Sequence, residues 1–213
     1  MGICNGMNLV FLAVLVGIIS CDTLVAGQFM LARPIIAAPL IGLCMGNPYL
    51  GFLIGVCVEL VWIRVIPVGS SIPPDGALTA VIAVSVAGAA KYNYGIDDFA
   101  AAILALVVSI PFGIIFKSVE IRMRFYNSRV AADIKTSVIR GFPGAVDKAV
   151  FFAVGRTFLT GAVFFITAHL ILTLLPRQYW EIFDFLKIDT RLLMRYVYIL
   201  CFTQLFETFV RWK

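Results

Sequence analysis

Three ionisable side chains lie within an otherwise apolar part of the chain, between residues 55 and 76: Glu59, Arg64 and Asp75. An ionised group at membrane depth costs about 3 kcal/mol or more, so such groups commonly belong to a binding site or an ion pathway. Carboxylates accept hydrogen bonds from pairs of hydroxyls, and an aromatic ring such as Trp62 covers the apolar face of a sugar. This set of residues favours the binding of a polyhydroxylated ligand.

Each of these residues also has a purely structural interpretation. Glu59 and Arg64 are five positions apart and would form an ion pair across a helix break. Asp75 precedes a helix expected to start near Ala77 and would be its N-cap, and Trp62 would be a packing residue. We favour binding for Glu59 and packing for Trp62, and both interpretations stay open for Asp75.

The sequence contains no motif that indicates a catalytic, metal or redox centre. His169 is the only histidine, and it has no Cys, Asp or Glu at helical spacing, so we interpret it as a core or interface residue. The five cysteines are scattered and form no CxxC pair, which is typical of small buried side chains. We therefore predict no catalytic residue, no cofactor and no metal ion.

The residues that surround these candidates belong to an integral membrane protein. Hydrophobic residues make up 62% of the chain, against about 45–50% in soluble domains, and the mean hydropathy is +1.00. Long apolar runs predict helical spans, and Asp22 near the end of the first run is expected to face protein. The expected spans cover residues 9–26, 99–116, 149–175 and 192–210. The predicted fold class is all-α, a polytopic transmembrane protein with one integral membrane domain over residues 1–213.

Residues 33–76 form a different kind of segment, the one that carries the candidate site. Six of the nine prolines lie within it, and the apolar stretches at 35–45 and 49–66 are too short to span a membrane alone. Lipid cannot satisfy the backbone groups that such breaks expose, so they are tolerated only inside protein or around a polar cavity. We expect broken or re-entrant helices here.

The charge distribution predicts the orientation. Residues 117–148 carry seven basic and three acidic residues, which indicates a cytoplasmic loop that contacts the cytosol or lipid headgroups. Residues 176–191 carry three of each sign and are expected outside. The basic residues form no folded basic face, so we predict no nucleic-acid partner. The N-terminal run has no basic residue before Arg33, so we expect it to be retained rather than cleaved as a signal peptide.

Part of this pattern resembles a known family, most strongly over residues 24–88. The resemblance rests on Gln28-Phe29, Arg33-Pro34, the Pro-Leu-Ile-Gly-Leu run from Pro39, Gly51 to Gly55 with Glu59, and Pro67-Val68-Gly69 followed by Pro74-Asp75 and Ala77-Leu78. It is similar to the membrane subunit IIC of the mannose/fructose/sorbose family of the bacterial phosphotransferase system. Against that family the chain is expected to be short, without a further C-terminal hairpin.

The resemblance implies a sugar permease subunit in the bacterial cytoplasmic (inner) membrane. Such a subunit pairs with a IID membrane subunit and oligomerises as trimers of heterodimers. It translocates a hexose-like sugar, which the IIA and IIB subunits phosphorylate. The resemblance therefore implies a transport subunit rather than an enzyme. By position, Glu59 and Asp75 match the family's sugar-contacting acidic residues, and Gln28 lies in the matching N-terminal loop. With Trp62 and Arg64, these residues are the predicted substrate-binding set.

Two rival functions remain open at this point. One is a membrane-embedded enzyme that uses Glu59, Arg64 and Asp75 on a lipid-linked substrate. The other is a regulatory membrane subunit that transports nothing.

Overall fold

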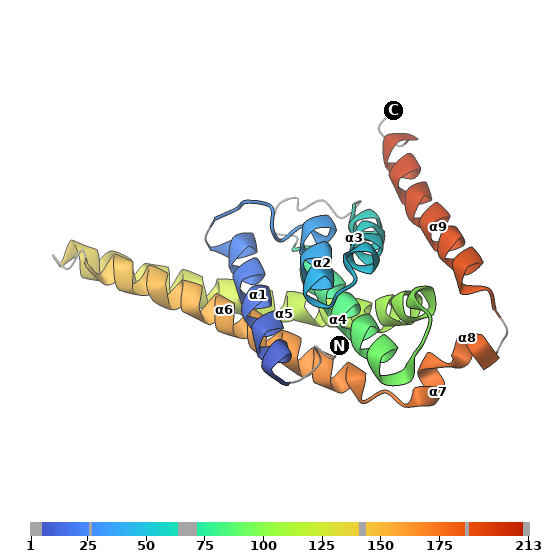
Figure 1. Cartoon of the computed structure of the whole chain (residues 1–213). Helices are drawn as coiled ribbons and strands as arrows, with labels where there is room; N and C mark the ends of the chain where they lie inside the picture. The colour runs from blue at the N-terminus through green and yellow to red at the C-terminus, as the bar shows by residue number, and fades with distance from the viewer. Residues whose placement is uncertain (1–5, 26, 64–71, 141–143, 186–187, 211–213) are drawn as a thin grey trace.

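The computed structural model describes residues 6–25, 27–63, 72–140, 144–185 and 188–210, and all regular elements within these ranges are helices (Figure 1). In chain order they are α1 (Gly6–Leu24), α2 (Pro34–Cys44), α3 (Pro48–Trp62), α4 (Gly76–Tyr94), α5 (Asp98–Ile139), α6 (Gly144–Thr173), α7 (Arg177–Trp180), α8 (Ile182–Phe185) and α9 (Thr190–Val210). The predicted all-α class is confirmed.

Helices α2 and α3 form a tight hairpin of short helices. By the rise of an α-helix they measure about 16 and 22 Å, less than the roughly 30 Å of a hydrocarbon core. The turn between them uses Gly46 at φ +79° and Asn47, whose side chain caps α3 by accepting from Leu50 N at 3.1 Å. Pro48 occupies the first turn of α3, where a missing N–H costs nothing. The prediction of broken helices in this segment is confirmed.

The α2–α3 hairpin is packed backbone against backbone. A Cβ atom added at Gly51 would lie 2.5 Å from the carbonyl oxygen of Ala38, and one at Gly55 would lie 2.5 Å from that of Pro34. Only glycine fits at such distances, because the neighbouring atom belongs to a backbone that cannot turn away. The glycines thus fix how α3 lies on α2, and with it the direction in which the end of α3 points.

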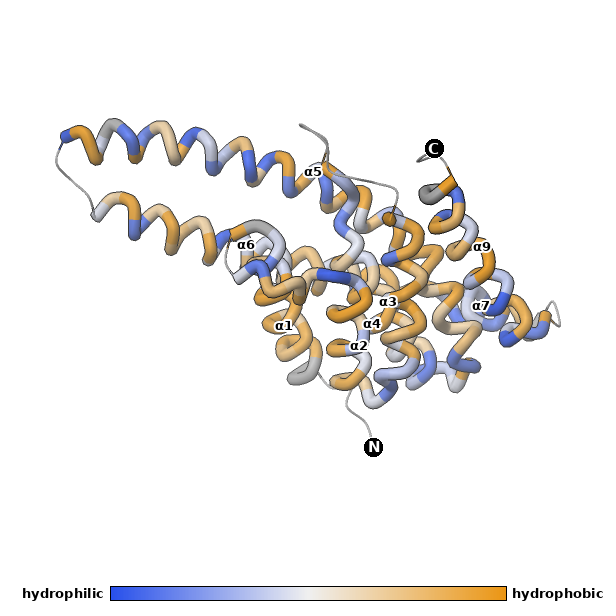
Figure 2. Tube along the Cα trace, turned by 90° about the horizontal axis from the view of Figure 1, so that it is seen from above, coloured by the Kyte–Doolittle hydropathy of each residue, from blue (hydrophilic) through white to orange (hydrophobic). Residues whose placement is uncertain are grey.

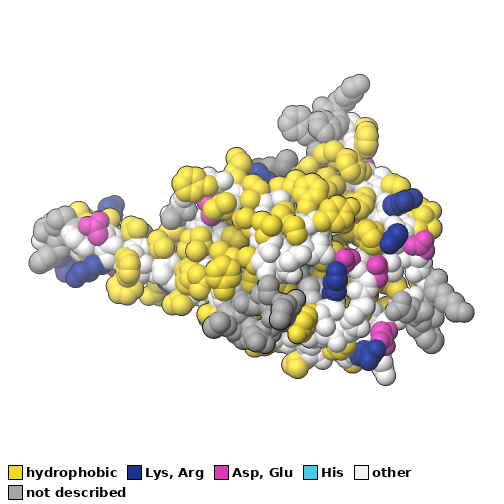
Figure 3. Space-filling model, in the orientation of Figure 1, with side chains coloured by type: hydrophobic (Ala, Val, Ile, Leu, Met, Phe, Trp, Pro, Cys, Tyr) yellow, Lys and Arg dark blue, Asp and Glu magenta, His cyan; other side chains and the backbone are white. Residues whose placement is uncertain are grey.

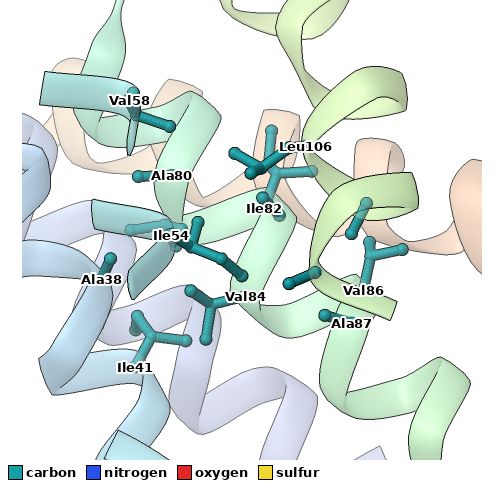
Figure 4. Packing of buried hydrophobic residues seen from close by; sticks show 14 of the residues in the cluster. Ala38, Ile41, Ile54, Val58, Ala80, Ile82, Val84, Val86, Ala87 and Leu106 are labelled. Atoms are coloured by element: carbon teal, nitrogen blue, oxygen red, sulfur yellow. The ribbon is translucent and has the colours of Figure 1, made fainter. Parts of the chain in front are cut away.

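Helix α4 lies at the centre of the bundle and packs against α2, α3, α5 and α6. Its side chains are mostly small and are buried along almost the whole helix. Figure 4 shows Val84 of α4 in one cluster with Ile41 of α2, Ile54 of α3 and Leu106 of α5, all of them buried. Small side chains let the helices approach closely, which is how helices associate where water provides no driving force.

His169 of α6 lies against this central helix. Its Nδ1 atom is 3.1 Å from the hydroxyl of Ser85, and its ring packs on Phe165 with centroids 5.9 Å apart. This arrangement agrees with the interpretation of His169 as a structural residue that joins two helices.

Residues 117–148 are not the loop that the sequence suggested. Most of them continue α5 as far as Ile139 or begin α6 at Gly144. Neither Gly nor Pro occurs between residues 117 and 139, so nothing interrupts the helix, and Arg124 pairs with Glu120 one turn earlier. The two helices project together beyond the bundle (Figure 1), and Figure 2 shows hydrophilic and hydrophobic residues alternating along this arm. Cytoplasmic placement of the segment stays a prediction.

The outer surface is strongly apolar, as Figure 3 shows for one face. Large side chains such as Leu174, Phe151 and Phe206 are 82%, 76% and 67% exposed. Helices Asp98–Ile139 and Gly144–Thr173 are long and apolar enough to cross a membrane by length and composition. Helix α9 packs on α3 and α5 at the edge of the bundle (Figure 1). Such a surface is suited to lipid rather than water.

Candidate functional site

A cavity of about 530 Å³ opens where α3 ends and α4 begins. The chain segment before α2, the last turn of α3, the first turn of α4 and the middle of α5 surround it. The polar and aromatic residues that line it are Thr23, Arg33, Glu59, Trp62, Asp75, Glu120 and Arg124. Three of the five predicted site residues, Glu59, Trp62 and Asp75, therefore share one cavity.

The two carboxylate oxygens of Glu59 differ in their hydrogen bonding to the described residues. Its Oε1 atom accepts a hydrogen bond from Nη1 of Arg33 at 3.0 Å. The alternative ion pair with Arg64 stays a prediction, because Arg64 lies outside the described residues. The Oε2 atom of Glu59 is buried and has no hydrogen-bond partner among the described residues. The Arg33 side chain is 60% exposed, so water screens the pair and it adds less than about 1 kcal/mol to stability. The pair leaves Glu59 with an acceptor for a ligand.

Trp62 stands one turn after Glu59 on the same face of α3. Its indole Nε1 is also buried without a partner among the described residues. A buried N–H without a partner costs about 1–3 kcal/mol, so an acceptor from a ligand or a water molecule would be favourable here. The last turn of α3 thus carries an acceptor and a donor that no described residue uses, on residues one turn apart.

Asp75 is the N-cap of α4. Its Oδ1 atom accepts from Leu78 N at 2.8 Å, and its backbone oxygen accepts from the Thr79 hydroxyl at 2.7 Å. The predicted capping role is confirmed. Because Asp75 also lines the cavity, capping and binding do not exclude each other: the cap uses Oδ1 and fixes where the carboxylate lies.

Glu120 and Arg124 line the cavity but were absent from the predicted set. Glu120 is 5% exposed and accepts from Nε of Arg124 at 3.1 Å. Sequence reasoning had counted both among the charges of a loop. The available signal was the spacing of Phe116, Glu120 and Met123, which continues one buried face of α5 past its apolar part.

The remaining two predicted residues lie elsewhere. Gln28 is exposed in the connection between α1 and α2, has φ +55°, and does not line the cavity. Arg64 lies outside the described residues.

Asp22 holds the connection in which Gln28 lies. Its carboxylate accepts from Phe29 N at 2.7 Å and from Ala32 N at 3.2 Å, while the side chain itself is buried. The expectation that Asp22 faces protein is confirmed. Through these bonds Asp22 positions the segment that leads directly to Arg33 at the cavity.

The cavity is suited to binding an uncharged, hydroxyl-rich molecule. Three carboxylates and two arginines supply acceptors and donors, and the indole supplies an apolar face. Among the described residues, no group of three His, Cys, Asp or Glu side chains is placed to hold a metal ion. Broken apolar helices around a cavity lined by charged side chains, carried by longer apolar helices, define a polytopic helical membrane protein.

Comparison with known proteins assigns the family. The family profile described as the sorbose-specific IIC component of the phosphotransferase system matches residues 7–189. The chain belongs to this family.

Two relatives from Escherichia coli (strain K12) match parts of the sequence. The mannose-specific EIIC component of the phosphotransferase system is 31% identical over 88 residues, which cover 38% of this chain and 32% of the relative. The putative N-acetylgalactosamine permease IIC component 2 is 33% identical over 55 residues, 26% of this chain and 41% of the relative. The chain thus spans about a third of the length of the first relative and about two fifths of the length of the second.

The fold also has a counterpart among solved structures. A chain described only as a membrane protein aligns with a TM-score of 0.63 and 14% identity, covering 96% of this chain and 80% of that one. At this identity the likeness concerns the fold alone.

Proposed function

We propose that this chain is the sugar-translocating IIC permease subunit of a mannose-family phosphotransferase system. The cavity binds a hexose-like sugar, and phosphoryl transfer is carried out by partner subunits. The observation that carries the proposal concerns two buried groups, Glu59 Oε2 and Trp62 Nε1, which have no hydrogen-bond partner within the described ranges. Their side chains line the same cavity as Asp75.

Each group has a role in this proposal. Glu59 and Asp75 accept hydrogen bonds from sugar hydroxyls, and the Trp62 indole donates one or covers the C–H face of the ring. Glu120, held by Arg124, is a third acceptor. A volume of about 530 Å³ leaves room for a monosaccharide with some water. The names of the two relatives, mannose-specific and N-acetylgalactosamine, favour a hexose.

The proposal includes partners and a location. Family membership supports a IID membrane subunit, IIA and IIB cytoplasmic subunits, assembly into trimers of IIC–IID heterodimers, and a multi-pass position in the bacterial cytoplasmic membrane. The exposed apolar side chains agree with contact to lipid and to a membrane partner.

An uptake assay tests the proposal. The chain is expressed with IID, IIA and IIB subunits in cells that lack their own mannose-family permease, and uptake of labelled hexoses is measured. We expect uptake of at least one hexose that depends on this chain. Absence of uptake of every hexose, with the chain present in the membrane beside its partners, would contradict the proposal. Turnover of a lipid-linked substrate by the purified chain alone would favour the enzyme instead.

A further inference from the structure

A second cavity, of about 460 Å³, lies between α5 and α6 on the arm and shares no lining residue with the first. Two cations line it, Lys148 and Arg156, together with the polar Asn127 and the aromatic Tyr126. None of its lining residues is acidic, and Asp147, next to Lys148 in the sequence, is not among them. Both charged side chains that line the crevice are therefore cations.

Arg156 is held in place rather than free in solvent. Its guanidinium lies 4.2 Å above the centre of the Tyr126 ring, and its Nη2 donates to Oδ1 of Asn127. Its Nε is buried and has no partner among the described residues. An oriented guanidinium with an unused donor is suited to a phosphate oxygen, for which arginine is the preferred ligand.

The rest of the crevice is apolar. Val130, Ala145, Ala149, Phe152 and Ala153 supply most of the remaining wall. Contact with such a wall does not stabilise a free phosphate or another small soluble anion, because it supplies no hydrogen bonds. It does stabilise the carbon chain of an amphiphile.

An apolar groove continues from the crevice along the same face of α6. Residues 149, 152, 156, 160, 163 and 167 follow at spacings of three or four, which places them on one side of the helix. The last three line a shallow groove of about 360 Å³, where Val163 is 56% exposed. From residue 156 to residue 167 the helix rises about 16 Å, close to half the roughly 30 Å of a hydrocarbon core.

We propose that the crevice between α5 and α6 binds the headgroup phosphate of an anionic phospholipid, whose acyl chain lies in the groove on α6. Lys148 and Arg156 hold the phosphate, and the groove holds the chain over the depth of one leaflet. Basic pockets between membrane helices are known to bind anionic lipid headgroups. The proposal is independent of the sugar site.

Lipid retention by the purified full chain tests this. Native mass spectrometry is used to compare retention of phosphatidylglycerol and phosphatidylcholine with identical acyl chains, for the unmodified chain and for three variants. Lys148→Gln removes one cation of the crevice and, because Lys148 is exposed, leaves the packing intact. Lys135→Gln is the matched control, an exposed cation of the same arm outside the crevice. Val163→Trp fills the groove.

We expect preferential retention of phosphatidylglycerol. Lys148→Gln is expected to weaken it about five-fold, and Lys135→Gln less than about two-fold, because only the first contacts the phosphate. Val163→Trp is expected to weaken retention of both lipids. An equal effect of the two lysine variants would show diffuse charge attraction and overturn the proposal. The proposal would also be overturned if inorganic phosphate displaced the lipid fully and Val163→Trp had no effect. That result would identify a site for soluble phosphate.

Discussion

At the scale of single residues, the cavity depends on side chains that are only partly satisfied by the protein. Glu59 accepts from Arg33 through one oxygen, whereas its other oxygen and the N–H of Trp62 are buried without a hydrogen-bond partner in the described part of the chain. Folding does not gain from such groups, because each costs free energy until a ligand or water supplies the missing hydrogen bond. In the proposed function these groups contribute to binding rather than to the stability of the fold.

Asp75 combines a structural and a proposed binding role, and two substitutions separate them. Asn caps a helix as well as Asp does, so Asp75→Asn is expected to leave the thermal unfolding midpoint unchanged, whereas Asp75→Ala costs about 1 kcal/mol. Both remove the charge, and a charge-assisted hydrogen bond is worth about 1.5–3 kcal/mol, so both are expected to lower sugar affinity about 10- to 100-fold.

Thermal unfolding in detergent and uptake kinetics measure the two effects. Normal uptake by Asp75→Asn would reduce Asp75 to a helix cap. A lowered midpoint in Asp75→Asn would leave the two roles mixed and contradict our description of the cap.

At the scale of elements, the α2–α3 hairpin positions the end of α3, and its glycines set the contact. Gly51→Ala is expected to destabilise the protein by about 1–3 kcal/mol, because the new Cβ atom meets the backbone of Ala38. Gly155→Ala on α6 is the control: its Cβ atom meets nothing within 4 Å, so it is expected to be neutral or to stabilise by up to about 1 kcal/mol. Midpoints of thermal unfolding compare the two. A Gly51→Ala variant as stable as Gly155→Ala would contradict the close packing.

The sequence predicted the elements well where local chemistry decides them. Prolines and glycines revealed the broken segment, and an aspartate before a run of small residues revealed the cap of α4. The prediction of a loop from the charged residues was wrong. Residues 117–139 are charged yet contain no helix breaker, and they continue α5. The partner of Glu59 could not be predicted either, because Arg33 approaches it only through the packing of α2 on α3.

At the scale of the whole molecule, α5 is too long to lie entirely within a bilayer. Its 42 residues measure about 63 Å, twice the roughly 30 Å of a hydrocarbon core. Its charged half must therefore leave the core or lie at the interface. The excess of basic residues there predicts the cytoplasmic side.

Labelling of single cysteines tests this orientation. In a chain whose native cysteines are replaced by alanine, Lys135→Cys is expected to react with a membrane-impermeant maleimide only in inverted vesicles. Gln178→Cys, which lies in the connection expected outside, is expected to react in intact cells. The opposite pattern would reverse the topology, and equal labelling of both sites in intact cells would rule out a membrane between them.

The central claim is that the cavity between α3, α4 and α5 is the sugar site, and equilibrium binding of labelled hexose to the purified chain and to Glu59→Gln tests it most directly. The substitution keeps the shape of the side chain but replaces a buried acceptor of the carboxylate by an amide. We predict saturable binding to the unmodified chain and a loss of about 10-fold or more in the variant, with unchanged membrane insertion. Undiminished binding by Glu59→Gln would contradict the assignment of the cavity.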